Sequence, residues 1–111
     1  PSGGTLHVVT KGAGKVSNVG VITMHVTAGI IESYSTALNA MAEEQLFLNN
    51  ELIKPTSVVV ATVADFGSGG TVFVFAVRVA DSGGSCTFIM RNIHNSAQMT
   101  STYKVSFAIF N

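Results

Sequence analysis

Residues 71–79, with the sequence TVFVFAVRV, decide the fold class of this chain. Successive side chains of a β-strand point to opposite faces, and here both faces are apolar. One face would carry Val72, Val74 and Ala76, and the other Phe73, Phe75, Val77 and Val79. A strand with one solvated face alternates apolar and polar residues, a pattern that only Arg78 keeps. The run therefore predicts a strand covered on both faces.

In a short chain, the second cover of such a strand is expected to be another copy of the protein. The sequence leaves open which face belongs to the core and which to the interface. The candidate interface residues are therefore taken from both faces: Val72, Val74, Ala76, Arg78, Phe73 and Phe75.

The composition describes one domain with few charges. The chain has 111 residues, of which 47% are hydrophobic and 11% are charged, whereas roughly 25% are charged in typical proteins. Six basic residues balance six acidic ones, which gives no electrostatic footprint for nucleic acid or an anionic membrane. A neutral, charge-poor monomer is weakly protected against association. Much of the surface is therefore expected to contact partners.

Targeting and redox signals are few. No segment has the composition of a membrane span or a signal peptide. Cys86 is the only cysteine, so it cannot form an intrachain disulfide. It stands in an apolar alternation without an activating neighbour, which predicts a small buried hydrophobe rather than a nucleophile.

Glycine-rich and aspartate-containing turns separate short runs of Val, Ile, Thr and Phe, which suit a pleated sheet. The predicted strands are Thr5–Thr10, Val21–Val26, Gly29–Ser33, Glu44–Asn49, Ser57–Val63, Thr71–Ala80, Ser85–Asn92 and Thr102–Phe110. This spacing predicts an all-β fold, an antiparallel β-sandwich or jelly roll with seven to eight strands. Ser57–Val63 is apolar on both sides and is expected to be a central strand.

The stretch Tyr34–Glu44 differs from the rest because its Ala, Leu, Met and Glu residues favour helix. It is expected to form either a short helical turn or an irregular strand. We divide the chain into residues 1–16, an N-terminal arm with the first strand, and residues 17–111, the sandwich.

The sequence contains no complete catalytic or ligand-binding motif. Gly12–Lys15 lacks the earlier glycine of a phosphate-binding loop, since Val9 occupies that position, and is expected to be a basic turn. Asp65 and Asp81 precede glycine-rich turns, where aspartate commonly caps the backbone.

The remaining polar and aromatic residues do not form a recognisable site. The histidines are far apart in the sequence and are expected to be unrelated: His7, His25 and His94. The adjacent carboxylates Glu43 and Glu44 point to opposite faces of a strand, so their expected role is solubility or a salt contact between subunits. An aromatic carbohydrate platform of Phe47, Phe66 and Tyr103 is disfavoured because the chain has no Trp. No catalytic residue, metal site or cofactor is predicted.

Several strand-and-turn motifs carry a resemblance to a known family: Gly20–Met24, Ala28–Glu32, Phe47–Asn50, Ser57–Val60, Gly84–Phe88, Arg91–Ile93 and Lys104–Ile109. With them, the chain resembles a small β-sandwich domain of tailed-bacteriophage structural proteins. The domain occurs in capsid decoration (cement) proteins and tail-fibre heads, especially of phages of cyanobacteria and marine bacteria. Asn49, Asn50 and Asn92 are expected to end strands and cap turns with their amides. Residues 36–44 depart from the family's polar, β-rich pattern.

The resemblance implies a non-enzymatic virion component that is commonly trimeric. The expected protein is a homotrimeric capsid decoration protein on the capsid surface, where it binds the major capsid protein and stabilises capsomer junctions. Residues 1–16 would lie on a neighbour as an arm. The alternative is the receptor-binding head of a tail fibre or spike, whose partner would be a host glycan. A small carbohydrate-binding module is a third class. Neither nucleic acid nor membrane is an expected partner.

Overall fold

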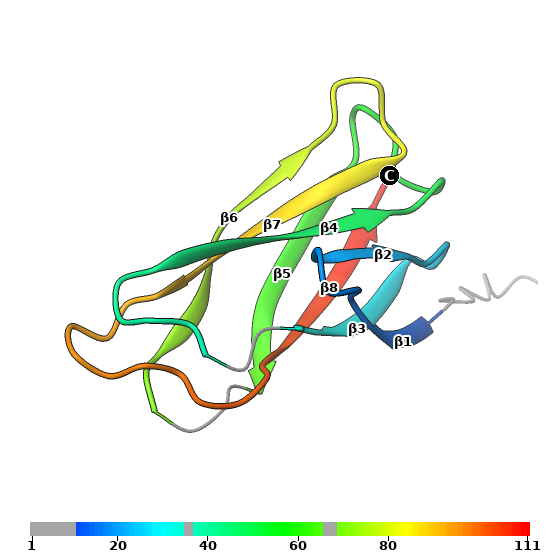
Figure 1. The fold of residues 1–111 in the computed structure, drawn as a ribbon. Helices are drawn as coiled ribbons and strands as arrows, with labels where there is room; N and C mark the ends of the chain where they lie inside the picture. Colours follow the sequence, from blue (N-terminus) through cyan, green and yellow to red (C-terminus); the bar gives the residue numbers. More distant parts are fainter. Residues whose placement is uncertain (1–10, 35–36, 66–68) are drawn as a thin grey trace, which may run out of the picture.

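A computed structural model describes residues 11–34, 37–65 and 69–111, which form two packed β-sheets without a helix (Figure 1). The strands are β1 Lys11–Lys15, β2 Val21–Thr23, β3 Ala28–Glu32, β4 Glu43–Asn49, β5 Val58–Asp65, β6 Val72–Val79, β7 Ser85–Asn92 and β8 Lys104–Phe110. Sheet A has the order β1-β3-β8-β5 and sheet B the order β2-β4-β7-β6. The predicted all-β sandwich is confirmed.

Both sheets are mixed, so the expected purely antiparallel arrangement is wrong at two strand pairs. β1 runs parallel to β3 and β2 parallel to β4, whereas the other pairs are antiparallel. The reason is the path of the chain, which changes sheet between β1 and β2 and again between β2 and β3. Strands joined by such a crossover can run parallel, whereas a tight hairpin forces them to be antiparallel.

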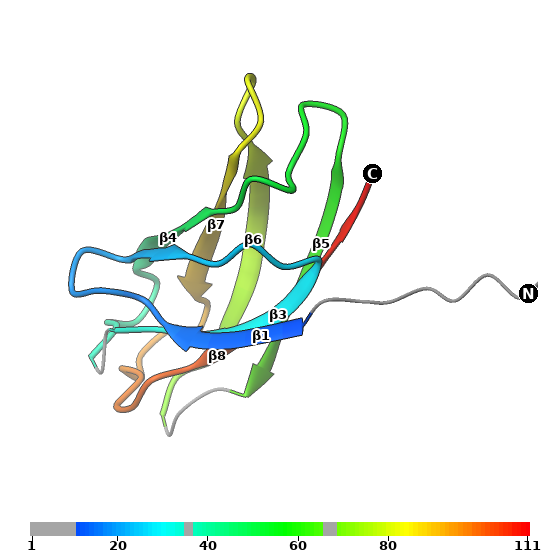
Figure 2. The ribbon, with the colours of Figure 1, turned by 90° about the vertical axis from the view of Figure 1, so that its right-hand side faces the viewer.

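β1 replaces the basic turn expected at Gly12–Lys15, and that prediction is wrong. Glycines are common in turns, but in this structure Gly12 and Gly14 lie in a strand, where the absence of a side chain leaves room for Met24 and Ile22. A Cβ on Gly12 would lie 2.5 Å from the Met24 sulfur, and one on Gly14 would lie 2.8 Å from Ile22 Cδ1. The expected domain boundary after residue 16 therefore comes after β1, and β1 belongs to sheet A. Figure 2 shows β1 beside β3. The expected strand Thr5–Thr10 lies outside the described residues.

The core lies between the sheets and includes one face of β7 and one face of β8. Its central members are at most 6% exposed: Cys86, Phe88, Met90, Tyr103, Val105, Phe107 and Ile109. The rings of Phe88 and Phe107 meet across the sheets with their centroids 5.9 Å apart. Burial of these side chains is the main favourable contribution to the stability of the sandwich.

β6 contains a bulge that changes the expected assignment of its faces. Its register with β7 shifts between Val74 and Ala76, so the alternation restarts in the opposite phase after that point. The core side carries Val72, Val74, Val77 and Val79, and the outer side carries Phe73, Phe75, Ala76 and Arg78. The predicted groupings of Ala76 with Val72 and of Val77 with Phe73 are therefore wrong.

β5 is an edge strand, which corrects the expectation that Ser57–Val63 is central. Its inward residues Val59, Ala61 and Val63 pack against the core. Its outward residues Val58 and Val60 are 59% and 49% exposed. The second apolar side of this strand is therefore a surface, and it is not covered by the described residues.

The segment between β3 and β4 forms no helix over its described residues, so the helical alternative is wrong there. Leu38 instead forms an isolated antiparallel bridge with Met99, and both side chains are buried. Met41 adopts a φ of 61° just before β4 begins. The apolar residues that favoured a helix thus include one that closes the end of the core.

Two buried asparagines hold the loops at the ends of the sandwich, as expected. Asn92 Nδ2 donates to the carbonyls of Leu38 and Ala97, and its Oδ1 accepts from the backbone N–H groups of Thr71 and His94. At the other end, Asn50 Nδ2 donates to the Val26 carbonyl. These amides satisfy backbone groups that would otherwise be costly to bury.

Replacement of Asn92 by alanine should lower the free energy of unfolding by about 2 to 4 kcal/mol, because it leaves several buried backbone groups unpaired. Urea denaturation measures this change. Asn49→Ala is the matched control, since Asn49 is exposed on β4, and it should change stability by less than about 0.5 kcal/mol. Equal effects of the two substitutions would contradict the role given to Asn92.

Candidate functional site

The outer face of sheet B holds the accessible members of the predicted interface set. Phe73, Phe75, Ala76 and Arg78 lie on this face, whereas Val72 is buried and Val74 packs against the core. The structure therefore divides the predicted set between the interior and one outer surface. Only the outward residues can meet a partner while the sandwich stays closed.

One half of this face carries an aromatic and charged cluster. The rings of Phe73 and Phe75 meet edge to face with their centroids 6.2 Å apart. The Arg91 guanidinium lies 4.3 Å from the centroid of the Phe75 ring, and its Nη2 lies 3.0 Å from Glu43 Oε1. Glu43 thus pairs within the chain, so the expected roles in solubility or a contact between subunits are not needed to explain it.

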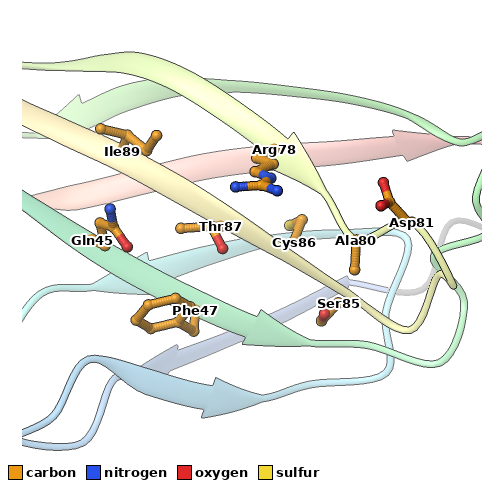
Figure 3. Close-up of a pocket in the computed structure, with 9 residues that line it drawn as sticks. All are labelled: Gln45, Phe47, Arg78, Ala80, Asp81, Ser85, Cys86, Thr87 and Ile89. Carbon is orange, nitrogen blue, oxygen red and sulfur yellow. The ribbon is translucent and has the colours of Figure 1, made fainter.

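The other half of the face is hollowed (Figure 3). The register places Phe47 of β4 and Arg78 of β6 on either side of Thr87 of β7. Thr87 is shorter than Phe47 and Arg78, and the neighbouring Ser85 and Ala80 are also short, so the surface sinks over β7. The resulting depression has a volume of about 350 Å³.

The lining of this hollow mixes one aromatic ring with polar and charged groups. Figure 3 shows Phe47 and Gln45 on one side, Arg78 and Asp81 on the other, and Thr87 between them. No ion pair joins Arg78 to any residue in the described ranges. An accessible guanidinium beside hydroxyl and amide groups can bind a small polar molecule.

Sequence reasoning singled out Arg78 but missed that Gln45, Phe47 and Thr87 lie beside it. The alternation of Leu46 and Leu48 could have placed Gln45 and Phe47 on the outer face. No signal within one strand could have placed them next to Arg78, because that depends on the register of three strands.

The outer face of sheet A is apolar at one end, whereas its other end carries the Lys15–Glu32 ion pair and Lys104. Cross-strand pairing places Phe110 beside Val58, and Ala108 between Ala28 and Val60. Val58 and Phe110 are each 59% exposed. These residues, with Ile30, form what we call the β5–β8 surface: Ala28, Ile30, Val58, Val60, Ala108 and Phe110.

The other sequence candidates are structural. Nδ1 of His25 accepts from the Glu51 backbone N–H, and Nδ1 of His94 accepts from Ser96 and Ala97. No group of metal-binding side chains occurs within the described ranges. His7, which was predicted to be unrelated to the other two, lies outside them.

The disfavoured carbohydrate platform does not form, because Tyr103 is buried in the core. Its burial, and then the nearby Glu44, raise the pKa of the Tyr103 phenol well above its ordinary range. Phe47 is accessible on the outer face of β4, and Phe66 lies outside the described residues. The expectation that Glu43 and Glu44 point to opposite faces of a strand is confirmed. Glu44 lies on the core side of β4 and Glu43 on the outer side.

Comparison with known proteins finds no matching family model, curated protein or solved structure. In the described ranges, no helix has the length and apolar character needed to span a bilayer.

Cys86 should behave as a buried, unreactive thiol. Burial raises its pKa from 9.0 to about 12, and the thiolate is the species that reacts. Labelling with an aromatic disulfide reagent should be slow in the folded protein at about pH 8 and fast once concentrated guanidinium unfolds it. The stabilising contribution of the neutral thiol should persist below pH 9 and decrease as the pH rises toward 12. Equal labelling rates in the folded and unfolded protein would contradict this assignment.

Proposed function

We propose that this chain is a non-enzymatic structural protein of the virion, a capsid decoration (cement) protein. It trimerises on the outer shell, binds the major capsid protein and stabilises the junctions between capsomers. The observation that supports this most is the apolar β5–β8 surface, which is exposed in a chain with only 11% charged residues. Contiguous apolar patches on soluble proteins commonly mark interaction sites.

Repeated weak contacts around a closed shell would stabilise it strongly. Removal of apolar surface from water stabilises a contact by about 25 cal/mol per Å². A few hundred Å² at each junction therefore contributes several kcal/mol before the cost of association is deducted. A trimer multiplies this contribution, because its subunits bind neighbouring sites as a linked set. The summed contacts would help the shell resist the pressure of packaged DNA.

A decoration protein needs one surface for its own copies and another for the shell. The sandwich offers two outer surfaces with different chemistry. The β5–β8 surface is apolar, whereas the Phe73 and Phe75 cluster carries the Arg91–Glu43 ion pair. We assign the apolar surface to contacts between copies, because such contacts stay buried. The more polar cluster suits a contact made later, with the capsid.

A receptor-binding head on a tail fibre or spike is the second candidate. The hollow between Phe47 and Arg78 favours it, since a concave site with aromatic and polar groups suits a small ligand such as a host glycan. A decoration role does not require such a site.

Light scattering of the purified protein, combined with rebinding to capsids stripped of it, tests the proposal. A stable trimer that rebinds shells is the expected result. A trimer that ignores shells but attaches to host cells would favour the fibre head. A monomer that does neither would overturn both assignments.

Val60→Lys tests whether the β5–β8 surface joins the copies. A lysine there would place a charge in the contact, which should weaken association by about tenfold or more, measured by sedimentation. Thr62→Lys is the matched control, because Thr62 is also exposed and lies two residues along the same face of β5. Its effect should be smaller. Unchanged association of the Val60 variant would remove this surface from the contact.

Deletion of residues 1–10 tests the proposed arm, since Lys11–Lys15 pairs with β3 and Val16 is buried. This deletion should leave the melting temperature nearly unchanged but weaken binding to stripped shells. Deletion of residues 1–16 should destabilise the sandwich as well, because it removes an edge strand and a core residue. Unchanged shell binding after the shorter deletion would exclude an arm.

A further inference from the structure

We propose that the hollow on the outer face of sheet B binds an acidic sugar, a pyranose that carries a carboxylate. The geometry of the hollow supports such a ligand whether or not the protein decorates a capsid. The hollow is one depression, and the side chains that could contact a ligand there are Gln45, Phe47, Arg78, Asp81, Ser85 and Thr87.

The shape of the hollow limits its ligand to one ring at a time. Phe47 and Arg78 lie on the strands that flank β7, so their backbones are about 10 Å apart across two strand spacings. Their side chains narrow this gap from both sides. Thr87 and Ser85 form a floor that is short enough for a ring to rest on it. An α-helix, with a diameter of about 10 to 12 Å, is too wide to enter.

Arg78 supplies the recognition of a negative charge. It lies on the outer face of β6 opposite Thr87 and makes no ion pair with a described residue. A guanidinium binds a carboxylate through two parallel hydrogen bonds, which fixes both the position and the orientation of the ligand.

Asp81 favours a monoanion over a phosphate. It lines the hollow on the same side as Arg78 (Figure 3). A phosphate dianion would be repelled by this carboxylate, since like charges at short range disfavour binding. A sugar carboxylate carries a single charge, and its ring hydroxyls can donate hydrogen bonds to Asp81. The pairing of one cation with one anion thus suits a ligand that is both acidic and rich in hydroxyl groups.

The remaining groups suit the neutral part of a sugar. The Phe47 ring is 38% exposed and offers an apolar surface to the C–H groups of a pyranose. Gln45, Ser85 and Thr87 carry amide and hydroxyl groups that both donate and accept hydrogen bonds. Apolar contact on one side and hydrogen bonding on the other is the usual pattern of a small-molecule site.

NMR titration of the full chain with trigalacturonic acid, and separately with a glucuronic acid disaccharide, tests the proposal. We expect saturable shifts of the Phe47, Arg78 and Thr87 amides with at least one of these probes. The methyl ester of the same probe should bind about tenfold more weakly or worse, because it lacks the charge that Arg78 recognises. Absence of saturable shifts with both acids, or shifts confined to other residues, would overturn the assignment.

Substitution separates the role of Arg78 from general electrostatics. Arg78→Gln should abolish the preference for the acid over its ester, and Arg78→Lys should retain only part of it. Arg91→Gln is the matched control, since Arg91 lies on the same face but outside the hollow, and it should leave the affinity unchanged. A thermal melt confirms that each variant is folded. Equal loss in the Arg78 and Arg91 variants would contradict a specific site.

The outcome is independent of the decoration role. A protein that binds the acids but ignores stripped shells would support this site and overturn the capsid assignment. A protein that rebinds shells and binds neither acid would do the reverse.

Discussion

The contact between the inner faces of the two sheets is the constraint on which the whole structure depends. Phe88 of β7 meets Phe107 of β8 at its centre. Among the strands in the described part of the chain, the path changes sheet after each of β1 to β5, so there β6 and β7 are the only consecutive strands that form hydrogen bonds with each other. All other sequence neighbours are held together by their loops and by the core between the sheets. Loss of core packing would therefore separate most consecutive strands.

Patterns within one strand were predictable from the sequence, and relations between strands were not. Apolar residues alternate with other residues in Ser85–Asn92, and one face of that strand and one face of Lys104–Phe110 are buried. The expectation that Asn50 and Asn92 cap turns was correct, because buried amides after a strand have few other uses. The bulge in β6 shifts its alternation by one residue, so strict alternation assigned some residues to the wrong face. The edge position of β5 could not be predicted, because a run that is apolar on both sides is also typical of a central strand.

The same distinction applies to the candidate site. Arg78 stood out because it alone interrupts an apolar run, and a local irregularity of this kind is visible in a sequence. The hollow beside it arises from the height of side chains on three strands, and the order of those strands is set by long-range pairing. The two outer faces also differ in a way that composition could not reveal. One combines the apolar β5–β8 surface with an ion pair at its far end, whereas the other divides into an aromatic cluster and a polar depression.

The position of β8 has a consequence for the order in which the molecule can assemble. β8 lies between β3 and β5 and is the strand that joins them within sheet A. Residues 11–65 can therefore not complete that sheet until Lys104–Phe110 is available. During synthesis, this strand leaves the ribosome after every other strand described, so the sandwich is expected to close only after those strands have been made. Contacts so distant along the chain slow folding, because the entropy of closing long loops is lost before the contacts form.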